Sequence, residues 1–291
     1  MASYSIWLMD LGRSSHFKTD HLYNGFYKPG QASSMSMGQL LVKGEGRVIM
    51  IDTGVDPEDP AGRNMLLSRG YNDALPPTKM VERLGLTGDD VTDVIITHAH
   101  WDHIGAIHRF PNAHFYMQKD EYLKWLELLT FPPEFSILSR CITLEHFEAL
   151  VHLCKDHRLT LLDGAVDNLF PGIHIRVAAN SHSFASQLVI IETETKSYMA
   201  VGDAAYAYEN FTKEIDGRYL PTATSVSAGN MRDMLETMKE IHDFCQGDKT
   251  RALIVHNCET WNYFPCSLKD PAHPLAEICL AKGETSHIEQ E

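Results

Sequence analysis

Three histidines and one aspartate lie within six positions of the stretch THAHWDHIGA, residues 97–106. His98 and His100 alternate along the chain, so on an extended loop their imidazoles project to the same side. Asp102 and His103 follow one turn later, where they can serve a second metal ion beside the first. Imidazole and carboxylate groups are ligands of zinc and similar metals. The stretch therefore predicts part of a metal site that needs ligands from elsewhere.

Three candidate ligands stand at the ends of predicted strands. His182 follows the run IRVAANS, Asp203 ends the run YMAVGD, and His256 ends the run ALIVH. A single histidine or aspartate in such a place is more often a turn former or a satisfied polar group. In open α/β sheets, however, sites form at the carboxyl ends of strands. Together with the 97–106 stretch, these residues favour a metal site.

The elements that must position these ligands can be read from apolar patterns. Strands are expected at 3–12, 38–54, 91–97, 113–118, 173–177, 187–193 and 197–203, with 251–256 as the last buried strand. The run 38–54 breaks at Gly44-Glu45-Gly46, which is a hairpin signal. Residues 13–37 show no clear period and are expected to form a loop at the rim of a pocket.

Three helices are expected between and after these strands. One runs over 119–129 and stops at Pro132-Pro133. Thr143 can cap the next, with apolar positions at Leu144, Phe147, Leu150, Val151 and Cys154. Asn230 opens an amphipathic helix that Gly247 closes. This order of elements predicts one α/β domain with helices outside its sheets.

Composition narrows the class of protein. The chain has 291 residues, 44% of them hydrophobic, and a net charge of −14 that argues against nonspecific nucleic-acid binding. No apolar run reaches the roughly 18 residues of a membrane span. The start MASYSIWLMDLG has no signal-peptide pattern, so a cytoplasmic location is expected, and the six scattered cysteines are expected to be reduced thiols.

The motifs THAHWDH, GDAAY and IDTG (51–54), with His182 and His256, resemble the metallo-β-lactamase superfamily, and the similarity runs from about Gln39 to about Phe264. The resemblance implies an αββα sandwich, in which two mixed β-sheets are flanked by helices. A single domain over 1–291 is expected, with a helical insertion at about 130–157 and a frayed C-terminal tail at about 282–291.

The resemblance also implies a set of ligands for two divalent metal ions. One ion would take His98, His100 and His182. The other would take Asp102, His103 and His256. Asp203 would bridge both ions. Asp52 would support the stretch 97–106, called the metal loop below, without binding a metal ion itself. Zinc is the expected metal, and iron and manganese are alternatives.

Within the superfamily, GDAAYAYENF (202–211) and MQKDEY (117–122) are similar to segments of N-acyl-homoserine lactonases and pyridoxolactonase. This similarity implies that Tyr206 touches the carbonyl oxygen of a small-molecule substrate, although a purely structural tyrosine fits the pattern equally well. It also implies a homodimer. Two departures concern the substrate: NSHSFAS (180–186) replaces the usual PGHTPGH, and Asn257 stands where lactonases often have aspartate.

The expected activity is hydrolysis of a lactone or small carboxylic ester. Two metals about 3.5–4 Å apart can share a water and lower its pKa toward neutrality. Asp102, Asp203 and Tyr206 are the candidate catalytic residues; Tyr206 would steady the oxyanion and Asp203 would pass a proton to the leaving alkoxide.

Other activities are compatible with the same ligands. A lactam, a thioester or an activated aryl ether could be the bond cleaved, and an iron-bound redox protein is a further alternative. The acidic charge disfavours a nuclease. A non-catalytic scaffold is disfavoured because all seven ligand positions are filled.

Further histidines and aromatic residues are secondary candidates. His108 and His114 are expected behind the site or on the surface. His146, His152 and His157 are expected on a solvated helix face rather than at a lid, and Cys258 as a buried inert thiol. Aromatic residues that could line a pocket are Phe17, Tyr23, Phe26, Tyr27, Phe131 and Phe135.

Overall fold

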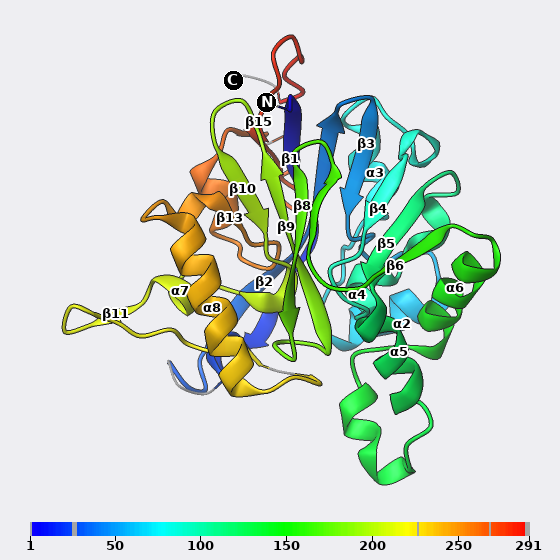
Figure 1. The fold of residues 1–291 in the computed structure, drawn as a ribbon, viewed down its shortest axis with the longest axis vertical. Helices are drawn as coiled ribbons and strands as arrows, with labels where there is room; N and C mark the ends of the chain where they lie inside the picture. Colours follow the sequence, from blue (N-terminus) through cyan, green and yellow to red (C-terminus); the bar gives the residue numbers. More distant parts are fainter. Residues whose placement is uncertain (1, 25–27, 226, 268, 289–291) are drawn as a thin grey trace.

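The computed structural model describes residues 2–24, 28–225, 227–267 and 269–288. Two β-sheets pack face to face and helices cover their outer faces (Figure 1). This is the αββα sandwich expected from the sequence. Within the described parts of the chain, no helix has both the length and the apolar character needed to cross a membrane.

The larger sheet has eight strands in the order β14-β15-β1-β2-β3-β4-β5-β6. It is mixed, because β3, β4, β5 and β6 run parallel while the other neighbours are antiparallel. The strands are β1 (Tyr4–Lys18), β2 (Ala32–Gly44), β3 (Arg47–Ile51), β4 (Asp93–Ile95), β5 (His114–Gln118), β6 (Leu159–Leu162), β14 (Cys266–Ser267) and β15 (Leu275–Cys279).

The smaller sheet has five strands in the order β13-β10-β9-β8-β7. Only the pair β10 and β13 is parallel, so β8, β10 and β13 all run in the same direction. The strands are β7 (Val166–Phe170), β8 (Ile173–Ala179), β9 (Ala185–Glu192), β10 (Ser197–Ala200) and β13 (Ala252–Leu253). A separate hairpin joins β11 (Glu214–Ile215) to β12 (Arg218–Tyr219).

Both faces of each sheet are buried because alternate side chains serve different layers. In β1, Ile6 and Leu8 point between the sheets, where they meet Ile175 and Val189 of the smaller sheet. Trp7 on the same strand belongs to the layer under the outer helices. Near-continuous apolar runs such as SYSIWLM are therefore what a sheet covered on both sides requires.

The helices lie in two outer layers. α2 (Pro60–Ser68), α3 (Pro77–Glu82), α4 (Trp101–Ile104), α5 (Lys119–Leu128) and α6 (Leu144–Lys155) contribute to the core outside the larger sheet. α8 (Met231–Cys245) and α7 (Glu209–Thr212) cover the smaller sheet. α1 (Thr19–Tyr23) follows β1 and precedes β2 in the chain. The short 3-10 segments are η1 (Gly88–Asp90), η2 (Ile107–Arg109), η3 (Pro133–Ser139), η4 (Gly202–Ala204), η5 (Lys249–Arg251) and η6 (Thr260–Tyr263).

Several local predictions are confirmed. The turn between β2 and β3 has Glu45 at φ +50° and Gly46 at φ +74°, as a two-residue hairpin turn requires. Asn230 accepts a hydrogen bond from the backbone N–H of Asp233, and Thr143 accepts one from that of His146. These side chains satisfy backbone donors that the first helical turn leaves free.

Two predictions about the strands are wrong. Residues 13–37 are not an irregular loop, since β1 continues to Lys18 and β2 already starts at Ala32. The polar composition hides these strands because their outer halves leave the core. The 251–256 run is not the last buried strand either, because β15 pairs with β1.

The region 130–157 is helical, as expected, and the segment joining α5 to α6 extends away from the body at the lower right of Figure 1. The predicted solvated face is wrong for His146, which is 6% exposed, while His152 and His157 are exposed. Leu153 is buried, whereas Val151 is not. Whether this region is an insertion stays a prediction.

Near the C-terminus, the Ser286 hydroxyl and the His287 backbone N–H donate hydrogen bonds to Glu277. The last part of the tail predicted to fray, 289–291, lies outside the described residues, as do the candidate pocket residues Phe26 and Tyr27.

Candidate metal centre

The seven predicted ligands come from four chain segments that follow strands. His98, His100, Asp102 and His103 follow β4, and His182 follows β8. Asp203 follows β10 and His256 follows β13. Because β8, β10 and β13 run in the same direction, their carboxyl ends meet at one edge of the smaller sheet.

A close approach of two segments brings Asp203 to the metal loop. Gly202 has φ +50°, and a Cβ there would lie 2.8 Å from the Thr97 hydroxyl. A glycine lets the backbone adopt this left-handed conformation and pass so close.

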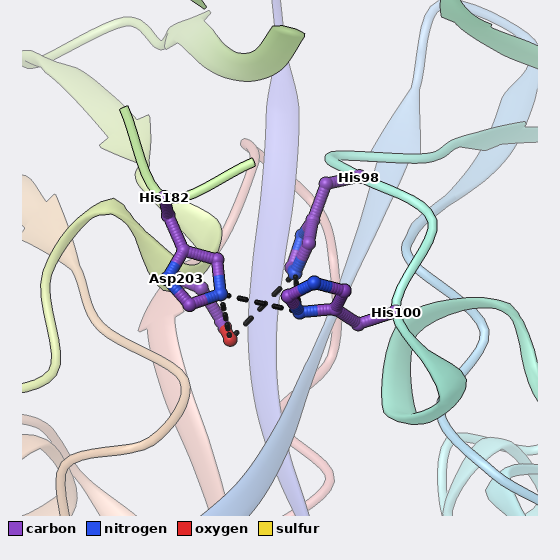
Figure 2. A group of neighbouring side chains, drawn as sticks. All are labelled: His98, His100, His182 and Asp203. Atoms are coloured by element: carbon purple, nitrogen blue, oxygen red, sulfur yellow. Dashed lines mark hydrogen bonds and ion pairs between the residues drawn. The ribbon is translucent and has the colours of Figure 1, made fainter. Parts of the chain in front are cut away.

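The first ligand group contains His98, His100, His182 and Asp203 (Figure 2). His100 Nδ1 lies 2.9 Å from His98 Nε2 and 3.2 Å from His182 Nε2. Asp203 Oδ2 lies 3.6 Å from His98 Nε2 and 3.3 Å from His182 Nε2. One donor atom of each side chain thus points into a common space.

The second ligand group contains Asp102, His103 and His256. The Nε2 atoms of His103 and His256 are 3.4 Å apart, and a carboxylate oxygen of Asp102 lies 3.6 Å from His256 Nε2. Asp203 Oδ1 lies 3.0 Å from His103 Nε2 and 2.9 Å from His256 Nε2. Asp203 therefore presents one carboxylate oxygen to each group.

The outward nitrogens of three histidines have acceptor partners. His182 Nδ1 lies 2.8 Å from the carbonyl oxygen of Ser225, and His256 Nδ1 lies 2.7 Å from that of Ser36. His103 Nδ1 lies 2.8 Å from a carboxylate oxygen of Asp52. Since these oxygens only accept, each Nδ1 must donate, which leaves the Nε2 lone pair toward the cluster.

The remaining two histidines are oriented through hydroxyl groups. Thr97 donates its hydroxyl hydrogen to Asp52, so its oxygen accepts from His98 Nδ1 at 3.0 Å. Ser227 donates to the carbonyl oxygen of His182, so it accepts from His100 Nε2 at 2.9 Å. All five imidazoles are therefore held with a lone pair facing the common space.

Asp52 supports the metal loop directly. Its carboxylate accepts the backbone N–H and hydroxyl of Thr97 as well as His103 Nδ1. Asp52 has φ +64°, a left-handed conformation that aspartate tolerates better than most residues. The role that the resemblance implied for IDTG thus has a physical basis in these contacts.

Glu121 of α5 is a supporting residue that the sequence analysis missed. Its fully buried carboxylate accepts hydrogen bonds from the backbone N–H groups of Ala99 and Ala185, at 3.0 and 2.7 Å. It also accepts from the Ser183 hydroxyl and the Trp125 indole. Glu121 therefore ties the loop carrying His98 and His100 to the loop carrying His182.

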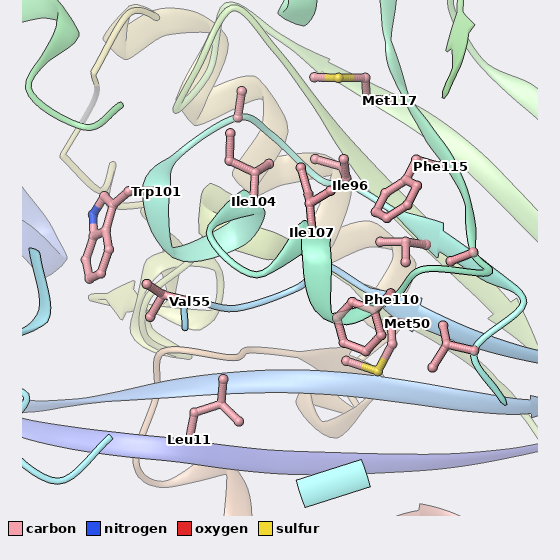
Figure 3. Packing of buried hydrophobic residues seen from close by; sticks show 14 of the residues in the cluster. Leu11, Met50, Val55, Ile96, Trp101, Ile104, Ile107, Phe110, Phe115 and Met117 are labelled. Atoms are coloured by element: carbon pink, nitrogen blue, oxygen red, sulfur yellow. The ribbon is translucent and has the colours of Figure 1, made fainter. Parts of the chain in front are cut away.

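A hydrophobic layer lies behind the metal loop. Figure 3 shows Ile104 and Ile107 packed among Val55, Ile96 and Phe110, all of which are buried. This packing fixes the segment that follows His103.

Burial and neighbouring charges act in opposite directions on the histidines. Burial holds the pKa values of His98, His100 and His182 below the usual range, which favours the neutral form that metals need. Burial is also the largest single influence on His103 and His256, but the neighbouring carboxylates, Asp203 foremost, together outweigh it and raise the pKa values of both. Despite its burial, Asp203 has a pKa well below the usual range because His256 and His103 favour its carboxylate.

The residues fit two divalent metal ions on chemical grounds. The inward nitrogens of His98 and His182 lie 2.9 and 3.2 Å from His100 Nδ1, and neutral imidazole lone pairs so close repel unless a cation lies between them. The inward nitrogens of His103 and His256 lie against the Asp203 carboxylate, where a cation could replace their protons. Asp203 Oδ1 is buried without an aligned hydrogen bond among the described residues, although two imidazole nitrogens lie near it. Imidazole and carboxylate ligands suit zinc, iron or manganese.

A cavity opens onto both ligand groups. Tyr206 lies in its wall and donates a hydrogen bond from its hydroxyl to Asp203 Oδ2, at 2.8 Å. Burial raises the pKa of Tyr206 well above the usual value, so the hydroxyl stays protonated and can donate. The wall also contains Phe17, His21, Met35, Arg69, Tyr71, Trp101, Arg140, Cys141, Ser225 and Ser227.

The pocket-rim prediction for 13–37 receives support from Phe17, His21 and Met35 in this wall. Sequence reasoning missed Arg69, Tyr71, Arg140 and Cys141 because they stand outside any motif. Phe131 and Phe135 are exposed and do not line the cavity, while Tyr23 and Cys258 line a neighbouring pocket.

The other candidate histidines lie away from the ligand groups. His108 is exposed and contacts Asp56, and His114 contacts the Thr160 hydroxyl. The partly buried Cys258 has a pKa raised by burial, as an inert thiol would.

Comparison with known proteins agrees with this fold and these motifs. The model of the metallo-beta-lactamase superfamily matches residues 39–243, well over half of the chain. The chain therefore belongs to the metallo-beta-lactamase superfamily. Together with the two ligand groups, this places it among the metal-dependent hydrolases of that superfamily.

Among its relatives is the N-acyl homoserine lactonase AiiA of Bacillus thuringiensis subsp. kurstaki, which is 26% identical over 243 residues, spanning 78% of this chain and 89% of the relative. A solved quorum-quenching N-acyl homoserine lactone lactonase superposes with a TM-score of 0.65 at 23% identity, over 89% and 94% of the two chains. AidC, described as a dizinc quorum-quenching lactonase, gives 0.64 at 16% identity, over 97% and 96%. These two structures show the shared fold.

Proposed function

We propose that the protein uses two divalent metal ions, zinc in the first instance, to hydrolyse a lactone or a small carboxylic ester. One observation carries the proposal: Asp203 presents one carboxylate oxygen to each of two ligand groups at the floor of a cavity. The relationship to N-acyl homoserine lactonases supports a lactone as the substrate class.

We expect the ligands to divide as the family resemblance implied. His98, His100 and His182 would hold one ion, Asp102, His103 and His256 the other, and Asp203 both. Two such ions supply an activated water at neutral pH and polarise a carbonyl group.

The protein's own groups would complete the reaction. The Tyr206 hydroxyl, now on Asp203, can turn to donate to the substrate oxygen that becomes negatively charged. We assign to Asp203 the uptake of the proton that the attacking water loses and its return to the leaving alkoxide, and to Asp102 the support of the second ligand group beside it. Tyr71, Phe17 and Met35 give the cavity an apolar side for the substrate.

The test measures metal content and turnover in the same preparation. Zinc, iron and manganese per chain are determined by mass spectrometry. The protein is then assayed against N-hexanoyl-homoserine lactone, an aryl acetate, a β-lactam, a thioester and a phosphodiester. We expect about two ions per chain, lactone or ester turnover, and its loss and recovery when a chelator removes the metal and zinc restores it.

A variant separates the tyrosine from the metal ligands. Tyr206→Phe should lower kcat for the lactone about 100- to 1000-fold at unchanged metal content, because an oxyanion donor is lost. Unchanged kcat would show that Tyr206 is structural. Turnover of only the lactam or the phosphodiester would overturn the proposed reaction, and iron with oxygen consumption would replace it with redox chemistry.

A further inference from the structure

Two arginines line the cavity that contains the ligand groups. Arg69 follows the end of α2, and Arg140 follows η3, so they reach the same cavity from separate segments. The other titratable groups of the wall are histidines, Tyr71, Tyr206, Cys141 and the two metal-site carboxylates Asp102 and Asp203. In a chain with a net charge of −14, two guanidinium groups beside the reaction site are unusual.

Arg69 is held in place without being neutralised. Its guanidinium lies over the ring of Trp101, 4.9 Å from the ring centre, and Trp101 stands between His100 and Asp102. Its N–H groups donate to the Ser68 hydroxyl and, at 3.4 Å, to the carbonyl oxygen of Arg140. Through the described parts of the chain, no carboxylate forms an ion pair with it.

Arg140 is tied to the same loop. The carbonyl oxygen of the next residue, Cys141, accepts a hydrogen bond from the Trp101 backbone N–H at 3.0 Å. The guanidinium donates to the carbonyl oxygen of Ile137, and it has no ion-pair partner among the residues that the structure describes. The 97–103 loop thus sets the positions of both arginines relative to the ligand groups.

Other arginines of the chain have either kind of partner. Arg13 and Arg47 pair with carboxylates, whereas Arg63, Arg83 and Arg158 donate to backbone carbonyl oxygens. What distinguishes Arg69 and Arg140 is their place in the wall of the cavity. Arg69 is half-buried and Arg140 is exposed, so both lie where a molecule entering the cavity can reach them. Their remaining N–H groups match a planar carboxylate or a phosphate.

We propose that Arg69 and Arg140 bind an anionic group of the substrate, so that the natural substrate is a lactone or ester carrying a carboxylate away from the bond that is cleaved. This inference rests on the proposed function. The anion would sit at the arginine side of the cavity while the reacting carbonyl sits at the ligand groups.

The experiment compares matched substrates with the zinc-loaded enzyme. N-glutaryl-homoserine lactone carries a terminal carboxylate, and its terminal primary amide has nearly the same shape without the charge. An adipoyl pair tests a longer reach. We expect kcat/KM to favour the carboxylate by about 10- to 100-fold, since charge-assisted hydrogen bonds are the strong ones. Arg69→Gln and Arg140→Gln should each reduce this preference, and the double variant should bring it near one.

The controls separate recognition from damage. Arg63→Gln removes an exposed arginine of α2 that donates only to backbone carbonyl oxygens, so it should keep the preference. Arg69→Lys keeps the charge without the planar fork and should give an intermediate ratio. Zinc content shows whether a variant has disturbed the 97–103 loop, and the ratio between paired substrates is insensitive to a general loss of activity.

The outcomes are distinguishable. Equal kcat/KM for the amide and the carboxylate overturns the anion proposal while leaving the lactonase proposal intact. If the variants weaken product inhibition but leave the preference between paired substrates unchanged, the arginines bind the carboxylate that hydrolysis creates. That result also overturns the anion proposal. If other lactones and esters are hydrolysed but neither member of any pair is, the anion proposal fails and the proposed function stands. If no lactone or ester reacts, the proposed function itself fails.

Discussion

The two ligand groups, together called the cluster, differ in burial and in hydrogen bonding from the entrance to their cavity. Each ligand histidine is at most 4% exposed, and its outward nitrogen has a defined partner. We define the entrance as Phe17, His21, Arg69, Arg140 and Cys141. These residues come from the end of β1, from α1, from the end of α2 and from the segment between α5 and α6. Of these, His21 and Arg140 are exposed, and the other three are half-buried.

This difference separates reaction from specificity. In the cluster, removing one buried polar group leaves its partner without a hydrogen bond, which costs about 1–3 kcal/mol. At the entrance, an exposed side chain can change with little cost to the fold. The buried part therefore sets what chemistry is possible, and the entrance sets which molecule receives it.

The strongest way to test this comparison is to remove a ligand. His100→Ala should lower turnover by about a thousandfold or more, because the first group loses a donor and an activated water contributes much of the rate. Turnover and metal content are measured together, with circular dichroism to confirm folding. His108→Ala, which removes an exposed histidine, should keep both values. Full activity of His100→Ala would remove the assigned site.

Asp52→Asn should have the next largest effect, about 10- to 100-fold on metal affinity at the second ligand group. Asparagine places an N–H₂ group against either Thr97 or His103, both of which now donate to Asp52. If His103 changes tautomer, its Nε2 carries a hydrogen and can no longer bind a metal.

Zinc titration with a competing chelator measures this affinity. Asp89→Asn, an exposed aspartate, serves as the control. Equal affinity in both variants would mean that Asp52 does not orient His103.

Glu121→Gln should give a smaller loss, about tenfold in kcat/KM. Glutamine can still accept hydrogen bonds through one oxygen, but its N–H₂ group then faces a donor such as the Ala185 backbone N–H. The two ligand loops would lose part of their connection, so we expect slower metal uptake as well as slower turnover.

Glu127→Gln on the exposed face of the same helix is the matched control. If Glu121→Gln matches that control in metal uptake and turnover, the two ligand loops do not depend on this carboxylate.

The sequence predicts most of the fold and the two ligand groups, because strands and metal loops each follow a residue pattern that has a physical cause. Near-continuous apolar runs mark strands covered on both faces, and ligand types in 97–106 mark the metal loop. Glu121 could not be found in this way, since its role depends on Ala99 and Ala185 being close in space. The entrance was likewise hidden, because Arg69 and Arg140 are 71 residues apart in the sequence and come together only in the folded chain, where Arg69 donates to the Arg140 carbonyl oxygen and lies over Trp101.

Changes in the outer part of the 130–143 segment should have the smallest effect of all. Phe135 is 45% exposed and contacts Phe131, and neither lines the cavity. Phe135→Ala should therefore change kcat/KM for a neutral lactone less than about twofold and the free energy of unfolding by less than about 0.5 kcal/mol, as for surface substitutions. Urea unfolding and steady-state assays measure the two quantities.

Phe147→Ala, which removes a buried ring of α6, should instead lower the free energy of unfolding by about 3–5 kcal/mol. A large loss of turnover in Phe135→Ala with unchanged stability would extend the entrance beyond the residues that line the cavity, and it would weaken the boundary between a buried reaction site and an exposed specificity site.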